Sequence, residues 1–513
     1  MHAVDPNALD EVQPYEEARE HLDAHFDRVR LMVQRYMRRY ADRLLQADGS
    51  YADVCVSPQE LLRLLGLGAS PQVQLWLDQL GIPESATIVE NLLDLDEAVE
   101  DRTAVTTEAP LALEQLRDGF MLSSTEIDLL VAAAAPRLSV DMSRLFAVAW
   151  ADYSVRQPTC GFLAELVAEE HSEVEDVLAL LGDASRLVQY RLLVPGQHDL
   201  WRPRTPRVHA PVEVPQRVLD YLAGEALHAA VVPGCTLHRR GMPVDLLVID
   251  DDVRQTLDEA TGRPRPRLLL TGIRGVGRRT IALAYSSHAG DPILDIDLPR
   301  AIAGAGKEIL DRLAELVREA RLFHASLFLR LDGASEELAE KFGVIAPAVQ
   351  ALLAAFPGAI YLADKESTPL SRVLLGDTLE VAVPVPQAEG QAELWRRALA
   401  PSLGLEAAHR IGKEISRSYR LPPGGIYGAV DSAVNDAGGG DVPDMTRLLA
   451  AVRRSFDHGL TGLADIVDNP MNFDDIVLRP DTRKSVEEVL MFARHADKVF
   501  REWGFATRSH GGR

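Results

Sequence analysis

One segment constrains the fold of this chain more than any other. It reads RLLLTGIRGVGRRTIALAY over residues 267–285, so an apolar run enters a glycine-rich loop and a helix-forming stretch leaves it. Gly272, Gly275 and Gly277 have the spacing of a phosphate-binding loop, G-x-x-x-x-G-K-[ST]. Glycine is needed there because the backbone must wrap around phosphate oxygens and point its N–H groups inward. The segment therefore predicts a strand, a phosphate loop and a helix whose N-terminus favours an anion.

The positions after the last glycine lack the side chains that such a loop normally uses. Arg278 stands where lysine is expected, and Arg279 replaces the hydroxyl that would bind Mg²⁺, with Thr280 one place later. Arginine keeps the positive charge, but its wide planar guanidinium does not reproduce a compact ammonium group. Thr280 would need a shift of register to reach a metal ion. The loop therefore keeps the outline of a phosphate site and loses part of its chemistry.

A second motif is expected on a later strand, as an apolar run that ends in Asp-Glu. The run SLFLRLDG supplies Asp332 as a Mg²⁺ ligand, but Gly333 occupies the position of the glutamate that would activate water. Loss of a general base costs about 10²–10⁴ in rate. The next strand, AIYLADKE, offers Asp364 or Lys365 as a polar sensor, and Arg372 follows at the spacing of an arginine finger. We therefore expect ATP hydrolysis to be weak or absent.

The glycine-rich loop is open to three interpretations. It can be a plain strand-to-helix connection, a degenerate phosphate site with a structural role, or an active site in which Arg278 replaces the lysine. The agreement of strand, loop, helix and a spaced Asp332 favours a phosphate site over a plain turn. The substitutions favour the degenerate site over the active one.

Five apolar runs after residue 265 alternate with helix-forming stretches. The runs are RLLLTG, PILDIDL, SLFLRLD, AIYLAD and LEVAVPVP. Strands separated by helices imply a parallel sheet that helices cover on both faces. We therefore predict an α/β P-loop NTPase domain with a five-stranded parallel sheet over residues 266–386, followed by a helical lid over residues 387–458.

The N-terminal part is predicted to be helical over residues 1–94. Apolar residues at helical spacing indicate one long helix over residues 14–47 and a short helix around residues 57–68, and the acidic residues 95–110 are typical of a linker. The long helix carries arginines that we expect to face solvent or to pair with acids of the same helix. These arginines are Arg28, Arg30, Arg35, Arg38, Arg39 and Arg43.

Residues 111–205 contain several short helical stretches. They close with LVQYRLLVPGQHDLWRP, which alternates and turns like a small β-hairpin. Short helices followed by a hairpin predict a winged-helix domain. A connecting segment over residues 206–265 follows, and it includes the strand-like run VDLLVID.

The charge of the chain argues against nucleic acid as a partner. The formal net charge is −23, so the phosphate backbone would repel the protein unless a local basic patch remained. The third helix of the winged-helix domain, CGFLAELVAEEHSEVEDVLALL, has no Lys or Arg and carries Glu165, Glu169, Glu170, Glu173, Glu175 and Asp176. The local counter-evidence is the cluster Arg202, Arg204 and Arg207. We expect protein partners and no DNA, with a DNA-binding regulator as the alternative.

The composition is that of an ordinary globular protein, with 47% hydrophobic and 26% charged residues. No stretch reaches the roughly 18 apolar residues of a membrane span, and the first residues lack the apolar core of a secretory signal. Three distant cysteines fit a reducing cytoplasm. Cys235 and His238 have C-x-x-H spacing, but no second pair accompanies them, so we expect no structural metal.

Residues 266–458 resemble an AAA ATPase module. The stretches LSSTEIDLLVAAAAPRLSVDMSRLFAVAWADYSVRQPT, RVLDYLAGE and GIRGVGRRT sharpen the match, because together they are similar to large bacterial AAA proteins with an N-terminal winged-helix domain. Some of those proteins are encoded with phage-tail-like contractile injection systems. In that family the first ATPase module is commonly degenerate, with a G-R-R-T loop, and an intact second module follows. The resemblance covers roughly residues 110–506.

The resemblance implies that residues 459–513 begin a second module. Where an intact G-x-x-G-x-G-K-T loop is expected, the chain reads ATRSHGGR and ends, so we expect the active module to be absent, through truncation or because the chain is a fragment. The implied function is an assembly, remodelling or scaffold subunit that binds ATP and Mg²⁺ weakly and works with protein partners, as a homo-oligomer or beside an intact AAA module. An active ATP-hydrolysing remodelling protein is the alternative. The residues expected at the nucleotide are Gly272, Gly275, Gly277, Arg278, Arg279 and Thr280, with Asp332 at Mg²⁺.

Overall fold

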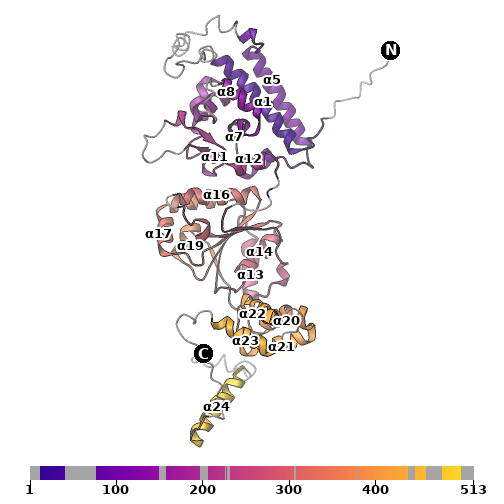
Figure 1. Ribbon diagram of the computed structural model, residues 1–513, viewed down its shortest axis with the longest axis vertical. Coiled ribbons are helices and arrows are strands. Elements are labelled where there is room, and N and C mark those ends of the chain that lie inside the picture. Colours follow the sequence, from indigo (N-terminus) through magenta and orange to yellow (C-terminus); the bar gives the residue numbers. More distant parts are fainter. Residues whose placement is uncertain are drawn as a thin grey trace, which may run out of the picture. The chain divides into compact units, whose positions relative to one another are not determined.

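A computed structural model describes most of the chain and is shown in Figure 1. The described residues are 12–40, 75, 77–149, 157–196, 206–225, 227, 232–305, 308–376, 378–436, 445–457 and 476–497. They form two compact units. Unit 1 gathers the described residues of Met1–Met242, Thr261–Leu269 and Ala282–Leu379, and unit 2 gathers those of Pro243–Ala260, Leu270–Ile281 and Glu380–Arg513. The short helix expected around residues 57–68 lies outside the described residues.

Two long helices open unit 1. Helix α1 (Ala18–Arg39) buries an apolar stripe, and α5 (Ser85–Val105) packs against it through Ile88 and Leu92. The linker expected over residues 95–110 is wrong for its first part, because α5 continues to Val105. An ion pair explains why this acidic stretch is ordered. Arg28 of α1 contacts the Asp96 carboxylate of α5 at 2.5 Å.

The arginines of α1 are less exposed than the sequence suggested. The Arg35 guanidinium donates to the carbonyl oxygens of Leu166 and Val167 at 3.2 and 3.0 Å, and Arg39 donates to that of Ala168 at 3.1 Å. These carbonyl groups lie at the C-terminal end of a neighbouring helix, where a helix favours positive charge. The prediction that these arginines face solvent or pair within the helix is therefore wrong for Arg35 and Arg39. Arg30 does pair with Asp27 of the same helix.

A series of short helices and a small antiparallel ladder complete the N-terminal part of unit 1. The helices are α6 (Ala112–Phe120), α7 (Ser124–Leu138), α8 (Val140–Ala149), α9 (Cys160–Val167), η1 (His171–Glu173), α10 (Val174–Ala179), α11 (Arg186–Gln189), η2 (Arg207–His209) and α12 (Gln216–Leu222). Strand β1 (Val194–Pro195) pairs with β2 (Val212–Glu213). The hairpin therefore closes later in the chain than expected, because Val212 and Val214 are buried and can serve as its inner face.

The acidic third helix is also broken where the sequence predicted one continuous element. Helix α9 ends at Val167, and the Glu173 carboxylate accepts hydrogen bonds from the backbone N–H groups of Glu169 and Glu170 at 3.1 and 3.2 Å. This local capping competes with the helix and starts a new one. Residues Glu169, Glu170, Glu173, Glu175 and Asp176 are exposed, so the surface of this region is strongly acidic.

One six-stranded sheet holds the five expected strands and one more. The strands are β3 (Cys235–His238), β4 (Arg267–Thr271), β5 (Ile293–Asp297), β6 (Ser326–Arg330), β7 (Ile360–Asp364) and β8 (Leu379–Ala382), in the order β3-β5-β6-β7-β4-β8. Strands β5, β6 and β7 pair in parallel, with Leu294 opposite Leu327. The extra strand β3 pairs antiparallel with β5 at the edge, so the predicted count of five was too low. Its half-exposed sequence CTLH has no buried apolar run that would mark it.

Helices connect these strands, as the alternation predicted. They are α13 (Asp251–Thr261), α14 (Arg278–His288), α15 (Leu298–Ala301), α16 (Ile309–Leu322), α17 (Glu336–Val344), α18 (Ala346–Ala354) and α19 (Pro369–Leu375). The strand expected at VDLLVID is wrong. That segment forms the turn η3 (Val244–Leu246) and leads into α13, whose first turn holds Asp251 and Asp252 where negative charge stabilises a helix.

Helices form the C-terminal part of unit 2, where a lid was expected. They are α20 (Ala388–Leu403), α21 (Leu405–Ser418), α22 (Pro423–Asp436), α23 (Met445–Asp457) and α24 (Pro480–Asp497). The first four share a core around the fully buried Trp395 and Ile426. Among all described helices, none has the length and apolar character that crossing a bilayer requires.

Helix α16 carries three charged side chains that are almost completely buried, namely Arg318, Glu319 and Arg321. The Glu319 carboxylate accepts hydrogen bonds from Arg217 of α12 at 3.0–3.1 Å. Arg321 donates to the carbonyl oxygens of Gly119 and Ala355, both at 2.7 Å. Charged groups are tolerated at this depth because each has a partner.

We expect Arg217→Ala to lower the free energy of unfolding of unit 1 by about 3–5 kcal/mol, because it leaves the buried Glu319 carboxylate without its counter-charge. Urea denaturation followed by circular dichroism measures this. The double variant Arg217→Met/Glu319→Leu should recover most of the loss. Lys341→Ala, which removes an exposed ion pair with Glu337, should leave the midpoint unchanged. Equal effects of Arg217→Ala and Lys341→Ala would contradict this account.

We also expect no measurable binding of duplex DNA at physiological salt, because the exposed acids of α10 and the loop before it would repel phosphates. Fluorescence anisotropy with a labelled duplex tests this over a range of salt concentrations. Sub-micromolar binding that weakens steeply with salt, and that Arg207→Ala reduces, would show that the basic residues near η2 form a DNA site instead.

Candidate phosphate-binding loop

The glycine-rich segment forms a tight loop between β4 and α14. Gly272, Gly275 and Gly277 have φ angles of 148°, 86° and 104°, values that side chains with a Cβ rarely adopt. Val276 is buried and its N–H donates to the Ile273 carbonyl oxygen at 3.2 Å, which closes the turn inside the loop. The backbone therefore has a conformation that only this glycine pattern permits without strain.

Close packing fixes the first glycine. A Cβ atom at Gly272 would lie 2.6 Å from the carbonyl oxygen of Val383, which directly follows β8. The Val383 N–H in turn donates to the carbonyl oxygen of Thr271 at 2.8 Å. The chain can thus pass from β4 into the loop beside β8 only because residue 272 has no side chain.

The helical part of unit 2 touches the loop at its middle glycine. The Gly424 N–H, in the first turn of α22, donates to the Gly275 carbonyl oxygen at 2.8 Å. A Cβ at Gly424 would lie 3.1 Å from the Cα of Gly275, so this contact also needs a glycine. The sequence LPPGG, which leads into the first turn of α22, therefore connects the loop directly to the expected lid.

The third glycine faces open space. An added Cβ at Gly277 would have no atom within 4 Å, and the Gly277 carbonyl oxygen accepts the Ile281 N–H at 2.9 Å as α14 begins. The N-terminus of an 11-residue helix begins here, and the helix dipole favours an anion at such a position. The open space at Gly277 leaves room for a phosphate group, and phosphate binding there stays a prediction.

The residues at the start of α14 differ in burial. Arg278 is 6% exposed, so its side chain points into the protein, whereas Arg279 and Thr280 are exposed. A buried guanidinium at the position of the phosphate-clamping lysine brings positive charge to the base of the loop. No hydroxyl stands at residue 279, where Mg²⁺ ligation is expected, so the residues present suit phosphate better than they suit Mg²⁺.

Asp332 and Gly333 lie in a turn after β6. The Ala334 N–H donates to the Leu331 carbonyl oxygen at 3.0 Å, and Ser335 caps α17 through the Leu338 N–H at 3.2 Å. Gly333 has a φ of 84° with open space around it, so the backbone itself selects glycine here. Asp332 is exposed. It belongs to unit 1 and the loop to unit 2, so a joint Mg²⁺ site stays a prediction.

The other predicted site residues follow β7. Asp364 is buried and both its carboxylate oxygens accept hydrogen bonds inside its own turn, from the Lys365 N–H at 2.7 Å and the Thr368 hydroxyl at 2.8 Å. These hydrogen bonds give Asp364 a structural role, because they stabilise the turn that leads into α19. Lys365 and Arg372 are exposed, so either can reach a ligand or a neighbouring protein. Their predicted roles as sensor and arginine finger stay predictions.

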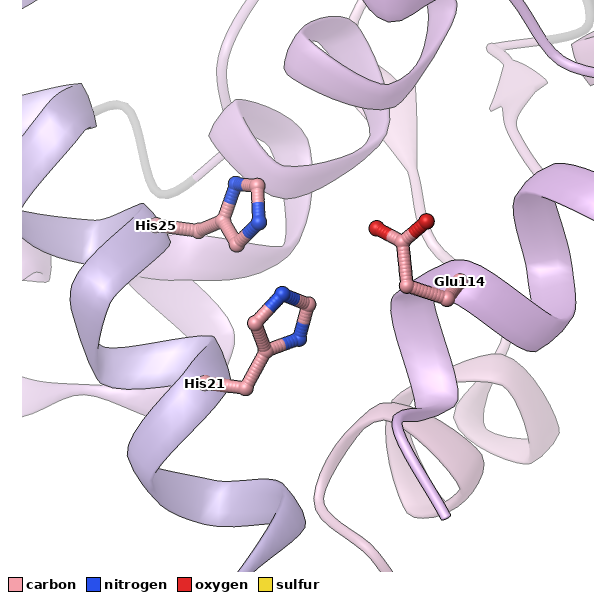
Figure 2. A group of neighbouring side chains, drawn as sticks. All are labelled: His21, His25 and Glu114. Atoms are coloured by element: carbon pink, nitrogen blue, oxygen red, sulfur yellow. The ribbon is translucent and has the colours of Figure 1, made fainter. Parts of the chain in front are cut away.

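Sequence reasoning missed one candidate group. The side chains of His21, His25 and Glu114 lie together inside unit 1 (Figure 2). The two histidines are four residues apart in the first long helix, and that spacing was the available signal. Glu114 lies far away in the sequence, so nothing in the linear pattern connected it to the pair.

Comparison with known proteins identifies the N-terminal part of the chain. Residues 4–234 match the family model described as "Winged helix domain, variant", so the predicted winged-helix domain is confirmed, and the match also takes in the N-terminal helices. Among curated proteins, none matches this sequence.

Solved structures with weak overall similarity include a katanin structure and a Walker-type ATPase. One was reported under "Structural Basis for Katanin Self-Assembly", with a TM-score of 0.31 and 14% identity over 41% of this chain and 84% of that one. Another is the Walker-type ATPase PABY2304 of Pyrococcus abyssi, with a TM-score of 0.31 and 16% identity over 44% of this chain and 76% of that one.

Proposed function

We propose that this chain is an AAA-type ATPase-like protein with a degenerate nucleotide site, and that it acts as an assembly or scaffold subunit which binds ATP weakly. One observation carries the proposal. The loop between β4 and α14 keeps the backbone of a phosphate cradle, with positive φ angles at all three glycines, but continues into Arg278 and Arg279. Backbone geometry for holding phosphate is thus retained where side chains for phosphoryl transfer are replaced.

The residues of this site provide groups that can bind phosphate but no side chain that can activate water. Phosphate would be held by the N–H groups around Gly275 and Gly277, by the N-terminus of α14 and by the charge of Arg278. None of these contacts needs a metal ion or a general base. Mg²⁺, when bound, would neutralise phosphate charge, and Asp332 is the carboxylate that this chain offers for it. Water activation has no side chain at Gly333, so binding outlasts hydrolysis in this proposal.

Bound nucleotide could act on such a subunit without being hydrolysed. Gly424 hydrogen-bonds the loop through Gly275, so phosphate in the cradle would stabilise the first turn of α22. A ligand that binds one arrangement of two elements shifts the population towards that arrangement. We infer that nucleotide sets the position of the helical lid, and that the client is a protein assembly such as those encoded with contractile injection systems.

The first test separates nucleotide binding from hydrolysis. We expect isothermal titration calorimetry to detect ATP binding, and phosphate release to be at least about 100-fold slower than in an intact AAA module, because the general base is missing. Gly277→Ala places a methyl group in the cradle and should weaken ATP binding at least about tenfold. Gly290→Ala is the matched control, because Gly290 has a φ of 88° and equally open space at the other end of α14.

Two outcomes would contradict the proposed function. Magnesium-dependent turnover near one per second, abolished by Asp332→Asn, would show an active ATPase. ATP affinity that is undetectable, or equally affected by Gly277→Ala and Gly290→Ala, would show a plain strand-to-helix turn.

The second test restores the missing side chains. Arg278→Lys/Arg279→Thr should strengthen Mg²⁺-dependent ATP binding and leave phosphate release unchanged, because water activation is still absent. Adding Gly333→Glu should raise turnover by less than the full 10²–10⁴ expected of a general base, since the φ of 84° at residue 333 costs a side chain about 1–2 kcal/mol. Thermal unfolding of the triple variant reports that strain. Full activity from one single reversion would contradict this division of roles.

A further inference from the structure

Two histidines and a glutamate converge inside the N-terminal part of unit 1. His21 and His25 lie one turn apart on α1, and Glu114 lies on α6. One ligand atom from each of the three side chains lies within 4.8 Å of the others. Figure 2 shows both imidazole rings projecting from the same face of α1 toward the carboxylate. Residues at i and i+4 share a helix face, which is why the two rings meet.

Both imidazoles are deeply buried, with His21 1% and His25 7% exposed. Burial, followed by the charges of Arg117 and Arg102, lowers the pKa of His21 to about 4. Burial, followed by His21, Arg28 and Arg117, lowers the pKa of His25 to about 3. A neutral imidazole keeps a nitrogen lone pair, which is the form that binds a metal ion.

His25 lacks the hydrogen bond that a buried imidazole normally makes. Its Nε2 atom has no hydrogen-bond partner among the described residues, although the side chain is more than nine-tenths buried. Most buried polar atoms in proteins do have a partner, so such an exception needs a cause. His21 differs, because its Nε2 lies 3.4 Å from the Thr103 hydroxyl. A second-sphere contact of this kind orients an imidazole toward a metal ion.

Glu114 can supply an anionic oxygen at this place. The Arg117 guanidinium holds one of its carboxylate oxygens, Oε2, at 3.0 Å. Burial raises the pKa of Glu114 from its ordinary value, and Arg117 opposes that shift. The carboxylate thus has a partner that fixes its orientation, as ligating carboxylates usually do.

A cavity of about 360 Å³ borders this group and gives it room for water. His25, Glu114 and Arg117 line it, together with the carboxylates of Asp96, Glu100 and Asp128. Two arginines face the same space, but Arg28 is neutralised by ion pairs with Asp96 and Asp128, both at 2.5 Å. The surroundings therefore hold enough negative charge to accept a divalent cation despite the arginines.

We propose that His21, His25 and Glu114 bind a zinc ion, with a water molecule from the cavity as the fourth ligand, and that this ion ties α1 to α6. Two imidazoles and one carboxylate are a ligand set that zinc accepts in tetrahedral geometry. Donor atoms in such a site lie roughly 3.3–3.5 Å apart for bonds of about 2.0–2.1 Å. The ligand atoms now lie within 4.8 Å of one another. Side-chain rotation on binding would bring the farthest pair closer by up to about 1.3–1.5 Å. The proposal replaces the expectation of no structural metal and does not depend on the nucleotide site.

The test is a titration of the full chain, freed of metal by a chelator, with Zn²⁺ and separately with Co²⁺. We expect one equivalent of Zn²⁺ to bind and to raise the melting temperature, because a ligand that binds only the folded state stabilises it. Co²⁺ should give the visible absorption of a tetrahedral site. His25→Gln and His21→Gln should each weaken Zn²⁺ binding by more than about 100-fold, and Glu114→Gln by about tenfold or more.

Matched variants keep the outcome clear. His409→Gln changes an exposed histidine on α21 and should leave Zn²⁺ affinity and the Co²⁺ spectrum unchanged. If His25→Gln unfolds the chain, Glu114→Gln and the Co²⁺ spectrum still report the site. No stoichiometric binding of Zn²⁺, or binding that none of the three ligand variants weakens, would overturn the proposal.

Discussion

The buried polar face of α16 is the interaction on which much of unit 1 depends. Arg318, Glu319 and Arg321 project from the helix in places where unpaired charge would be costly. Arg321 reaches the carbonyl oxygen of Gly119 and the Tyr190 hydroxyl, and Glu319 binds Arg217. These partners all come from the winged-helix part of the chain. The helix that covers the sheet is thereby joined to the preceding domain by hydrogen bonds whose geometry leaves little choice of orientation.

The candidate nucleotide site shows how backbone and side chains can diverge. Gly272 and Gly275 are held by contacts with the backbone at Val383 and Gly424, so their glycine identity serves packing inside unit 2 as well as any ligand. This packing alone requires glycine at both positions, whatever the loop binds. The backbone also requires glycine at residue 333 in the second motif. The positive φ of Gly333 belongs to a tight turn that a catalytic glutamate would strain.

Helix α1 serves as a common platform in the N-terminal part. Its apolar stripe packs on α5, while Arg35 and Arg39 bind carbonyl groups at the end of α9. Nearer the start of the helix, His21 and His25 face Glu114 of α6. The helix therefore uses polar side chains on several sides to order its neighbours. Its amphipathic pattern predicted the helix, but not these contacts.

The sequence by itself determined the local features. The apolar runs placed all five expected strands, and the glycine spacing placed the loop after β4 and the helix after it, because these patterns depend on near neighbours in the chain. The sequence alone also shows that Arg278, Arg279 and Gly333 stand where a phosphate-loop ATPase would have other residues. Tertiary structure decided what depends on distant partners. The half-exposed edge strand β3 forms only by pairing with β5. The segment before Asp251 leads into a helix and is not the expected strand. Arg35 and Arg38, which looked solvent-exposed in the sequence, are buried. Tertiary structure also brought Glu114 to the two histidines, because a cluster from separate helices has no signature until the helices pack.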